Sequence, residues 1–595
     1  MTGSADAPVV VDTLPGLFRA AVRAHPDRPA VSDGDRRLTY AELDRESDAV
    51  ASGLRARGVA VEDRVGLYAE RSVDLLVAVL GILKAGAAYV AVDSRYPDAR
   101  RDLMLHTSGA KLIICAPGWL DRLREFPADV VTLAEVTRSE PAPMPAVEPA
   151  SAANVLFTSG SSGQPKAIVL EHRNLVSLAL NPGLPQLTPA DRSGQISSVS
   201  FDAFNMELWT ALAVGAEVVV LPDVPDLLAA DFQRQLRRYG VTVMVVPTMV
   251  VNQVVRADRD AFAPLRLVRV GGDVLQPSAC RDLLGGRFSG ELYNMYGPAE
   301  ITTACTSHLV TMADAESDLI PIGRPLSGVT AHVLSPDLRP TADGEIGELF
   351  VAGPGVARGY QDQPGLTEER FRTITGDDGG PVRAYRTGDL VRRRPDGVLE
   401  FVGRADDQVR IRGYRVEPGE VERGLRRQRQ VQEAAVLPDG TADDRRLIAV
   451  VVVDGTPSVA ELRAQAERDL PDFMVPSHFI VVPQIPATDH GKRDMAALRE
   501  LLDAHRQRRD SYLPPGTDTE RYLVELWERL LGVENVGRNE NFFALGGHSL
   551  QAFQMHRRIS RDLGVKLPFQ AMLSNTVLAD LAALIDQSVA EGEPG

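Results

Sequence analysis

The sequence contains little cysteine and no long apolar run. Its three cysteines, Cys115, Cys280 and Cys305, are odd in number and far apart, which predicts neither a disulfide framework nor a zinc cluster. We expect reduced, mostly structural thiols.

No stretch reaches the roughly eighteen apolar residues that a membrane-spanning helix needs. The opening residues, MTGSADAPVV, also lack the basic and apolar regions of a signal peptide. We therefore expect a cytoplasmic protein with no membrane partner.

The sequence also lacks any long basic run to offset its acidic excess. The formal net charge is −16 and the pI is near 5.2. Nucleic acids and anionic membranes attract basic surfaces, so this charge argues against either as the main partner. Small molecules and proteins remain as candidate partners. At 595 residues the chain is too long for one hydrophobic core, and we expect several domains.

Short apolar runs alternate with longer segments of helical period, such as 72–84 and 226–239. This alternation predicts an α/β architecture with largely buried strands. The expected strands are VGLY (65–68), LIIC (112–115), VVTL (130–133), EVVVL (217–221), VTVMVV (241–246) and LVRV (267–270).

The pattern changes after about residue 405. Strand-like 433–437, 447–453 and 479–482, with helices around 458–469 and 495–509, predict a small α+β unit. A linker with a proline pair follows, and then TDTE (517–520), whose spacing is that of a capping box, opens an all-helical unit. We therefore divide the chain into a large N-terminal part, a small α+β part, a linker and a helical part: residues 1–405, 406–507, 508–516 and 517–590.

The stretch LFTSGSSGQPKAIV (156–169) joins an apolar strand to a loop of six small residues, 158–163, followed by Lys166. A loop so poor in side chains exposes backbone N–H groups, which bind oxyanions. It is no P-loop, because the spacing GxxxxGK[ST] is absent. The loop predicts a phosphate-containing ligand.

Further segments place this loop in a family. They are GGDVL (271–275), NMYGPAE (294–300), YRTGDL (385–390) and GRADDQVRIRGYRVEPGEVE (403–422). In order and rough spacing the chain resembles the adenylate-forming enzymes, which include acyl-CoA ligases, luciferases and the adenylation domains of nonribosomal peptide synthetases. LTYAEL (38–43) and HGKRD (490–494) resemble the peptide synthetases in particular. The resemblance covers nearly the whole chain through residue 505 and implies a large multi-sheet N-terminal domain with a small C-terminal lid.

The resemblance implies a set of nucleotide contacts. The loop would hold the β- and γ-phosphates of ATP, Lys166 would add a point charge, and Glu300 would bind Mg²⁺ together with substrate phosphates. Ala299 departs from the family pattern, where a threonine hydroxyl meets the α-phosphate. The implied residues are Thr158, Ser159, Gly160, Ser161, Ser162 and Gly163 for the loop, Gly271, Gly272, Asn294 and Tyr296 for adenine, and Asp389 and Arg404 for ribose. A loop cap and a surface ion pair are the alternative roles of the last two.

Two residues would act on the substrate itself. Lys492, in the final motif, would stabilise the charge that develops as a carboxylate attacks the α-phosphorus of ATP; its alternative role is that of a solvated lysine. Asp202, in FDAF (201–204), would hold the α-ammonium of an amino acid. A carboxylate in an apolar pocket is costly unless it is paired, and a turn or N-cap aspartate is the alternative.

The other selectivity positions are mostly apolar and include no second carboxylate, which argues against a basic substrate side chain. By alignment to the family they are Ala203, Met206, Val245, Arg269, Gly271, Met295, Thr303 and Ala304. Arg269 leaves two alternatives. If it faces the pocket, it favours an acidic or strongly polar substrate end. If it faces outward, the pocket suits a medium or bulky aliphatic residue, which is the alternative we prefer.

The C-terminal unit carries a separate motif, NFFALGGHSL (541–550). It resembles the phosphopantetheine attachment site of a peptidyl carrier, with Ser549 as the tether; an ordinary serine N-cap is the alternative. This implies a four-helix carrier domain and a phosphopantetheinyl transferase as a partner. By the same resemblance the lid would rotate about Asp406, withdrawing Lys492 and bringing the segment near Gly413 to the approach path of the thiol.

The chain is thus identified as a member of the adenylation and peptidyl-carrier group. It would use ATP and Mg²⁺ to form an aminoacyl-adenylate and load it as a thioester on 4′-phosphopantetheine at Ser549. No condensation or thioesterase region is recognised, so a downstream condensation domain or a tailoring enzyme would receive the amino acid, and an MbtH-like protein is a further candidate partner. The alternatives are a ligase that uses coenzyme A and a non-catalytic carrier scaffold.

Overall fold

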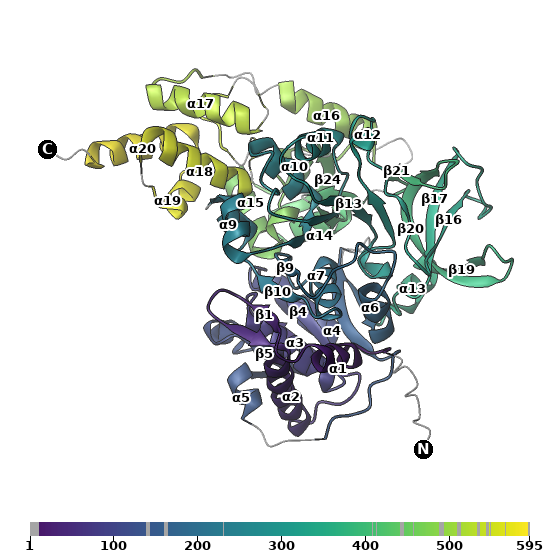
Figure 1. Cartoon of the computed structure of the whole chain (residues 1–595). Coiled ribbons are helices and arrows are strands. Elements are labelled where there is room, and N and C mark those ends of the chain that lie inside the picture. Colours follow the sequence, from purple (N-terminus) through teal and green to yellow (C-terminus); the bar gives the residue numbers. More distant parts are fainter. Residues whose placement is uncertain are drawn as a thin grey trace, which may run out of the picture.

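Figure 1 shows the computed structural model of the chain, in which a large α/β part is joined to a smaller lid and to a group of helices at the C-terminal end. The structure describes residues 11–138, 143–159, 165–229, 231–406, 408–411, 413–440, 445–455, 457–486, 493–507, 513–531, 533, 536–542, 545, 547, 549–565 and 567–592.

The first sheet of the large part is mixed, with a parallel centre. In spatial order its strands are β15 (Arg324–Pro325), β14 (Thr306–Leu309), β13 (Glu291–Tyr296), β12 (Leu267–Gly271), β11 (Val243–Pro247), β9 (Arg192–Gln195), β10 (Glu217–Val220), β1 (Pro29–Ser32) and β2 (Arg37–Thr39). Strands β11, β12 and β13 are parallel and in register, with Gly271 beside both Pro247 and Met295. The carboxyl ends of these strands therefore meet at one edge of the sheet.

The second sheet carries the glycine-rich loop. Its order is β18 (Gly359–Tyr360), β8 (Lys166–Glu171), β7 (Ala152–Thr158), β4 (Ala88–Val92), β3 (Arg64–Tyr68), β5 (Leu112–Cys115) and β6 (Asp129–Val131). Strands β7 and β8 pair antiparallel with Thr158 opposite Lys166. The loop is thus the connection of a hairpin, and the two residues at its ends are held side by side.

Helices fill the space between these two sheets. Helix α7 (Asp202–Leu212) contacts β9, β10 and β11 of the first sheet, whereas α6 (His172–Ala179) contacts β8 of the second. Helix α3 (Val73–Lys84) is buried along its whole length, which suits its apolar composition. One hydrophobic cluster spans both sheets and these helices, so the loop and the first turn of α7 are carried by one rigid core.

The other helices of the large part lie around this core. They are α1 (Leu14–Ala24), α2 (Tyr40–Ala56), α4 (Asp98–Ser108), α5 (Leu133–Thr137), α8 (Val224–Ala229), α9 (Phe232–Tyr239), α10 (Thr248–Ala257), α11 (Pro277–Leu284), α12 (Met312–Ala315), α13 (Pro364–Arg370) and the short 3₁₀ turns Pro117–Leu123 and Ala299–Ile301. A third, antiparallel sheet projects to the right in Figure 1. It contains β16 (Thr330–Leu334), β17 (Ile346–Ala352), β20 (Pro381–Arg393), β19 (Phe371–Thr375) and β21 (Leu399–Arg404).

The lid follows β21. It begins with the hairpin β22 (Val409–Ile411) and β23 (Tyr414–Val416), and its core is the sheet β24 (Val431–Asp439), β25 (Arg446–Val453) and β26 (His478–Val481). Its helices are α14 (Pro418–Arg426), α15 (Val459–Asp469), the 3₁₀ turn Asp472–Met474 and α16 (Met495–Gln507). The mixed composition of this unit agrees with the expected α+β fold.

The C-terminal part is helical in its described residues, with α17 (Asp518–Leu531), α18 (Ser549–Leu563), α19 (Phe569–Ser574) and α20 (Leu578–Gly592) at the upper left of Figure 1. Its own hydrophobic cluster includes the fully buried Trp527, which stacks edge-on against Phe542. Helix α17 opens after Thr517, whose hydroxyl accepts from the backbone N–H of Glu520 at 3.0 Å. The Glu520 carboxylate accepts from Gly516, so the hydroxyl half of the expected box forms and its carboxylate half is displaced by one residue.

Most of the expected elements form, but two expectations are wrong. The segment 226–239 is two helices, because α8 ends at Ala229 and Asp231 caps α9 by accepting from the backbone of Arg234. The run VVTL (130–133) is strand only as far as Val131, because the Thr132 hydroxyl caps α5. In both cases a short polar side chain offers the backbone a helix start that apolar period alone does not reveal.

The three cysteines are buried and free of disulfides. No helix of the described ranges is long and apolar enough to cross a membrane. Nor do the described residues bring together three or more histidine, cysteine or carboxylate side chains around a metal position.

We can test whether the C-terminal helical part unfolds independently of the large part. We expect Trp527→Ala to remove about 3–5 kcal/mol from its free energy of unfolding, because the indole is fully buried. The large part should keep its own transition in chemical denaturation followed by circular dichroism. The exposed Val589→Ala on α20 is the control and should change stability by less than about 0.5 kcal/mol. A single transition that shifts as a whole would contradict a separate C-terminal core.

Candidate functional site

A cavity of about 620 Å³ lies between the large part and the lid. The strand ends Gly271 and Met295, the first turn of α7 and the start of the glycine-rich loop line it from the large part. Arg410, Gly413 and Tyr414 line it from the lid. The cavity therefore gathers segments that are far apart in the sequence, and the lid forms one of its walls.

The phosphate loop contributes the residues at its ends. Thr158 and Ser159 line the cavity, whereas Gly160, Ser161, Ser162 and Gly163 lie outside the described residues. The Thr158 hydroxyl is buried and has no hydrogen-bond partner in the described part of the chain. Ser159 Oγ donates to the carbonyl of Arg415 at 2.7 Å. The unpaired hydroxyl fits a ligand that brings oxygen atoms to this end of the loop.

Asp202 is the first residue of α7 and opens onto the cavity. Burial raises the pKa of its carboxyl group to about 6, and the charge of Arg410 offsets this only in part. The N-cap residue of α7 is Phe201, and no side chain caps the helix. A carboxylate held at such a raised pKa gains from an incoming cation.

Apolar side chains form the wall beside Asp202. Met206, Val245, Met295 and Ala304 belong to one small cluster, with Ala203 at its edge. Of the predicted pocket positions, Ala203, Met206, Val245, Gly271, Met295 and Thr303 line the cavity, and Ala304 supports them from behind. A Cβ atom on Gly271 would lie 2.8 Å from the carbonyl oxygen of Met295, so this position requires glycine.

Thr303 is placed by an uncommon turn. Thr302 and Thr303 both have positive φ, 60° and 71°, a conformation that branched residues rarely adopt. The turn follows Glu300 and directs the Thr303 hydroxyl to the carbonyl of Asp202, to which it donates at 2.8 Å. It thereby ties the first turn of α7 to the loop after β13.

Arg269 lies behind the pocket and points neither into the cavity nor out to solvent. It is fully buried and not among the residues that line the cavity. Its guanidinium donates to Thr210 Oγ1 at 3.0 Å and to the carbonyl of Pro185. The parallel register places it beside Val245, but its long side chain reaches past the pocket to α7. Arg269 therefore turns away from the pocket, as in the preferred alternative, but it is buried rather than exposed to solvent.

The predicted ribose residues are engaged with one another. Asp389 and Arg404 face each other across β20 and β21 and form an ion pair. The hydroxyl of Tyr296 donates to the other oxygen of Asp389, and Asn294 donates to the carbonyl of Pro321 at 2.8 Å. Gly272 lines the cavity close by, with a positive φ of 99°. A loop cap or a surface ion pair does not describe Asp389, which is buried.

Glu300 is completely buried next to these residues. It accepts from the Tyr360 hydroxyl at 2.8 Å and pairs with Arg415, whose Nη1 lies 3.2 Å from its Oε2. Burial alone would raise the pKa of Glu300, but Arg415 and Tyr360 outweigh this effect and lower it. A charged carboxylate of this kind fits Mg²⁺, a cation that prefers oxygen ligands and needs few from the protein.

Lys166 is buried too, and its Nζ lies 3.7 Å from Oε1 of Glu417 in the lid. Burial lowers the pKa of Lys166, and the neighbouring Arg415 lowers it further. Neither Lys166 nor Glu300 lines the cavity in this arrangement, because lid side chains cover both.

The sequence analysis missed several lid residues that reach the site. Arg410 donates to the carbonyl of Gly272 at 2.6 Å. The ring of Tyr414 stacks on Phe473, with 4.0 Å between centroids, and tilts against Phe201. These residues belong to the motif 403–422 or contact it, but only Arg404, Asp406 and Gly413 of that motif were assigned a role. The density of charged residues in RIRGYRVEPGE (410–420) was the available signal.

Lys492 lies outside the described residues. Its neighbour Arg493 forms an ion pair with Glu422 of α14 and donates to the carbonyl of Ala434. Neither partner lines the cavity. The predicted hinge residue Asp406 accepts two hydrogen bonds from Arg404, at 2.7 and 2.9 Å.

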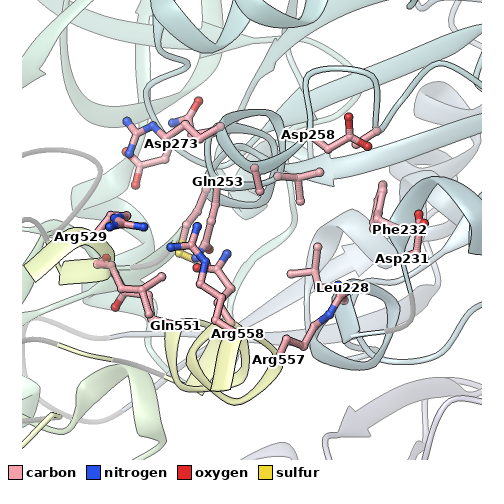
Figure 2. Close-up of a pocket in the computed structure, with 18 of the residues that line it drawn as sticks. Leu228, Asp231, Phe232, Gln253, Asp258, Asp273, Arg529, Gln551, Arg557 and Arg558 are labelled. Carbon is pink, nitrogen blue, oxygen red and sulfur yellow. The ribbon is translucent and has the colours of Figure 1, made fainter. Parts of the chain in front are cut away.

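A second cavity, of about 780 Å³, lies where the helical part meets the large part and the lid. Figure 2 shows Gln551 and Arg558 of α18 opposite Gln253 of α10. Its described lining contains seven arginines and three aspartates, and Arg557 donates to the carbonyl of Leu228. Met249 lines this cavity as well as the first one. Helix α18 begins at Ser549, so the predicted attachment residue starts a helix that lines the second cavity.

Family models match three parts of the chain. The model described as AMP-binding enzyme matches residues 18–361, and AMP-binding enzyme C-terminal domain matches residues 420–492. Phosphopantetheine attachment site matches residues 521–585.

Similar proteins support the same division. The chain is 36% identical to gramicidin S synthase 2 of Brevibacillus brevis over 98% of its own length, which is 13% of that synthetase. It is 35% identical to tyrocidine synthase 3 of Brevibacillus parabrevis over 97% of its length, or 9% of that synthetase. The chain therefore spans only a small part of the length of these two relatives.

A solved structure matches the whole arrangement. Holo-PA1221, a nonribosomal peptide synthetase protein with adenylation and carrier domains bound to a vinylsulfonamide inhibitor, has a TM-score of 0.83 at 28% identity. The match covers 97% of both chains.

Proposed function

Because the chain belongs to the family of AMP-binding enzymes and carries a phosphopantetheine attachment domain, we propose that it activates a neutral, mainly aliphatic amino acid. ATP with Mg²⁺ supplies the adenylyl group and pyrophosphate leaves. The thiol of the phosphopantetheine arm on Ser549 then takes the aminoacyl group as a thioester, and AMP leaves. The observation that carries this proposal is the first cavity, where a carboxylate of raised pKa and an apolar wall lie beside the start of the phosphate loop.

The substrate class follows from the charges around the cavity. Asp202 holds the α-ammonium of the amino acid, which offsets the cost of burying that carboxylate. The wall of Met206, Val245 and Met295 then receives the side chain. The guanidinium of Arg269 is hydrogen-bonded behind this wall. It therefore does not offer its positive charge to an acidic side chain of the substrate.

Adenylation needs the attacking carboxylate and the α-phosphate to meet. Lys166 and the loop hold the phosphates, Asp389 and Arg404 hold the ribose, and Gly271 and Gly272 leave room for adenine. Glu300 would hold Mg²⁺, which neutralises phosphate charge. Lys492 places a cation between the two reacting anions. The lid, residues 406–507, turns about Asp406 between the two half-reactions.

Transfer to the carrier uses the second cavity. Helix α18 lines this cavity, Met249 lines both cavities, and the arginines of the second cavity suit the phosphodiester of the arm. The arm supplies the thiol. A phosphopantetheinyl transferase attaches it, and a condensation domain or a tailoring enzyme takes the product onward. An MbtH-like protein is a further candidate partner, and the cytoplasm is the proposed location.

ATP–pyrophosphate exchange across a panel of amino acids tests the activation step. We expect the fastest exchange with neutral aliphatic amino acids, and a loss of at least about a hundredfold in Lys492→Ala with unchanged circular dichroism. The proposal would be refuted if none of the amino acids in the panel supported exchange. Soluble aminoacyl-coenzyme A as the main product would favour the coenzyme A ligase instead.

The raised pKa of Asp202 predicts that kcat/KM for the amino acid depends on pH. Protonation removes the charge that holds the ammonium, so kcat/KM for the amino acid at saturating ATP should be level above pH 6 and fall as the pH drops through about 6. The KM for ATP should change little. Asp202→Asn should lower kcat/KM and abolish the inflection. An inflection that survives in Asp202→Asn would assign it to another group.

Ser549→Ala tests the carrier. We expect exchange within twofold of the wild type but no mass increase from phosphopantetheine and no covalently bound amino acid in mass spectrometry of the intact protein. Ser560→Ala, on the same helix, is the matched control and should load normally. Loading of Ser549→Ala would place the tether elsewhere.

A further inference from the structure

In this lid arrangement, the two residues proposed to handle metal and phosphate are both paired with lid side chains. Arg415 lies 3.2 Å from Glu300, and Glu417 lies 3.7 Å from Lys166. All four side chains are buried or nearly so, with exposed fractions of 13% for Arg415, 7% for Glu417, 2% for Lys166 and none for Glu300. Each pair joins a charge of the large part to the opposite charge of the lid.

The two lid residues come from one extended stretch. Arg415 is in β23 and Glu417 is the N-cap residue of α14, so they are two positions apart and can reach the same side of the strand. Ser159 of the phosphate loop holds the backbone between them through the carbonyl of Arg415. The strand therefore lies against the phosphate loop.

Gln408 connects this pair to the hinge. Its Oε1 accepts from Arg415 Nε at 2.7 Å and from Arg404 Nη2 at 2.6 Å, and its amide group donates to Glu417. Arg404 also binds Asp389 and Asp406. The connected network thus runs from the proposed ribose residue, through the hinge, to the proposed metal residue.

Magnesium pyrophosphate and this network compete for the same partners. Mg²⁺ binds a carboxylate oxygen at about 2.0–2.1 Å, and its two positive charges would repel the guanidinium of Arg415 on the same buried carboxylate. A phosphate beside Lys166 would meet the negative charge of Glu417, and buried like charges repel strongly. The lid can therefore take this position only when the metal and the phosphates have left.

We propose that Arg415 and Glu417 are positioning residues for the thioester-forming step. They take the places of metal and pyrophosphate at Glu300 and Lys166, and so hold the lid where the Gly413 segment lines the reaction cavity. The pair supplies the buried Glu300 and Lys166 each with an opposite charge from the lid. This inference rests on the proposed function, because that function supplies the two half-reactions.

The test uses Glu417→Gln in the full-length holo-protein, with magnesium pyrophosphate as the probe. We expect calorimetry without ATP to show binding at least fivefold tighter than in the wild type, because the competing carboxylate charge is gone. Single-turnover loading of the carrier should slow at least tenfold, while ATP–pyrophosphate exchange stays within twofold. Glu417→Asp keeps the charge and should load within threefold of the wild type.

Glu420→Gln is the matched control. Glu420 lies on α14 and forms another buried ion pair between lid and large part, but its partner is Arg100 of α4 rather than Lys166. We expect its pyrophosphate affinity to stay within twofold of the wild type. Equal tightening in Glu420→Gln and Glu417→Gln would attribute the effect to lid docking in general and overturn the proposal.

Unchanged pyrophosphate binding and loading in Glu417→Gln would also overturn it. The wild-type exchange reaction separates this failure from a failure of the proposed function. Exchange in the wild type with no effect of Glu417→Gln rejects only the positioning pair, whereas absence of exchange with every amino acid rejects the function.

Discussion

The buried carboxylate of Glu300 sets the main constraint on this molecule. A charge with no access to solvent needs a partner of opposite sign, and in this arrangement Arg415 from the lid provides it. Since a metal ion would satisfy the same carboxylate, what occupies this site decides where the lid can rest. The two ion pairs thus help to fix the position of a unit of about a hundred residues, together with contacts such as the ion pair of Arg100 with Glu420.

The lid position can depend on these ion pairs because the hydrophobic core of the large part holds that part's members of both pairs rigid. The parallel strands β11, β12 and β13 end at one edge, the hairpin β7–β8 presents the phosphate loop, and α7 brings Asp202 between them. All three are anchored in shared hydrophobic packing. The lid meets this frame through polar contacts such as those of Arg410 and Arg415, and through the ring contact of Tyr414 with Phe201. Polar contacts can be exchanged for ligand contacts without exposing a hydrophobic core.

Much of the site could be predicted from the sequence because glycine-rich and charged motifs leave visible spacing. The start of the loop at 158–166, Asp202 and most of the apolar pocket positions do converge on one cavity. The orientation of Arg269 could not be predicted, since a period-two pattern gives the face of a strand and not how far a long side chain reaches. The break between α8 and α9 depends on Asp231, whose capping contact competes with a continuous helical period.

The sequence by itself determined the α/β class, the succession of a large part, a lid and a carrier, and which side chains we propose to be chemically active, because each depends on local pattern or motif. Only the tertiary structure decided which charges face each other. Lys166 and Glu417 are far apart along the chain, as are Glu300 and Arg415, and no local rule pairs them. Their pairing follows from how the lid packs against the large part, where burial favours the pairing of opposite charges.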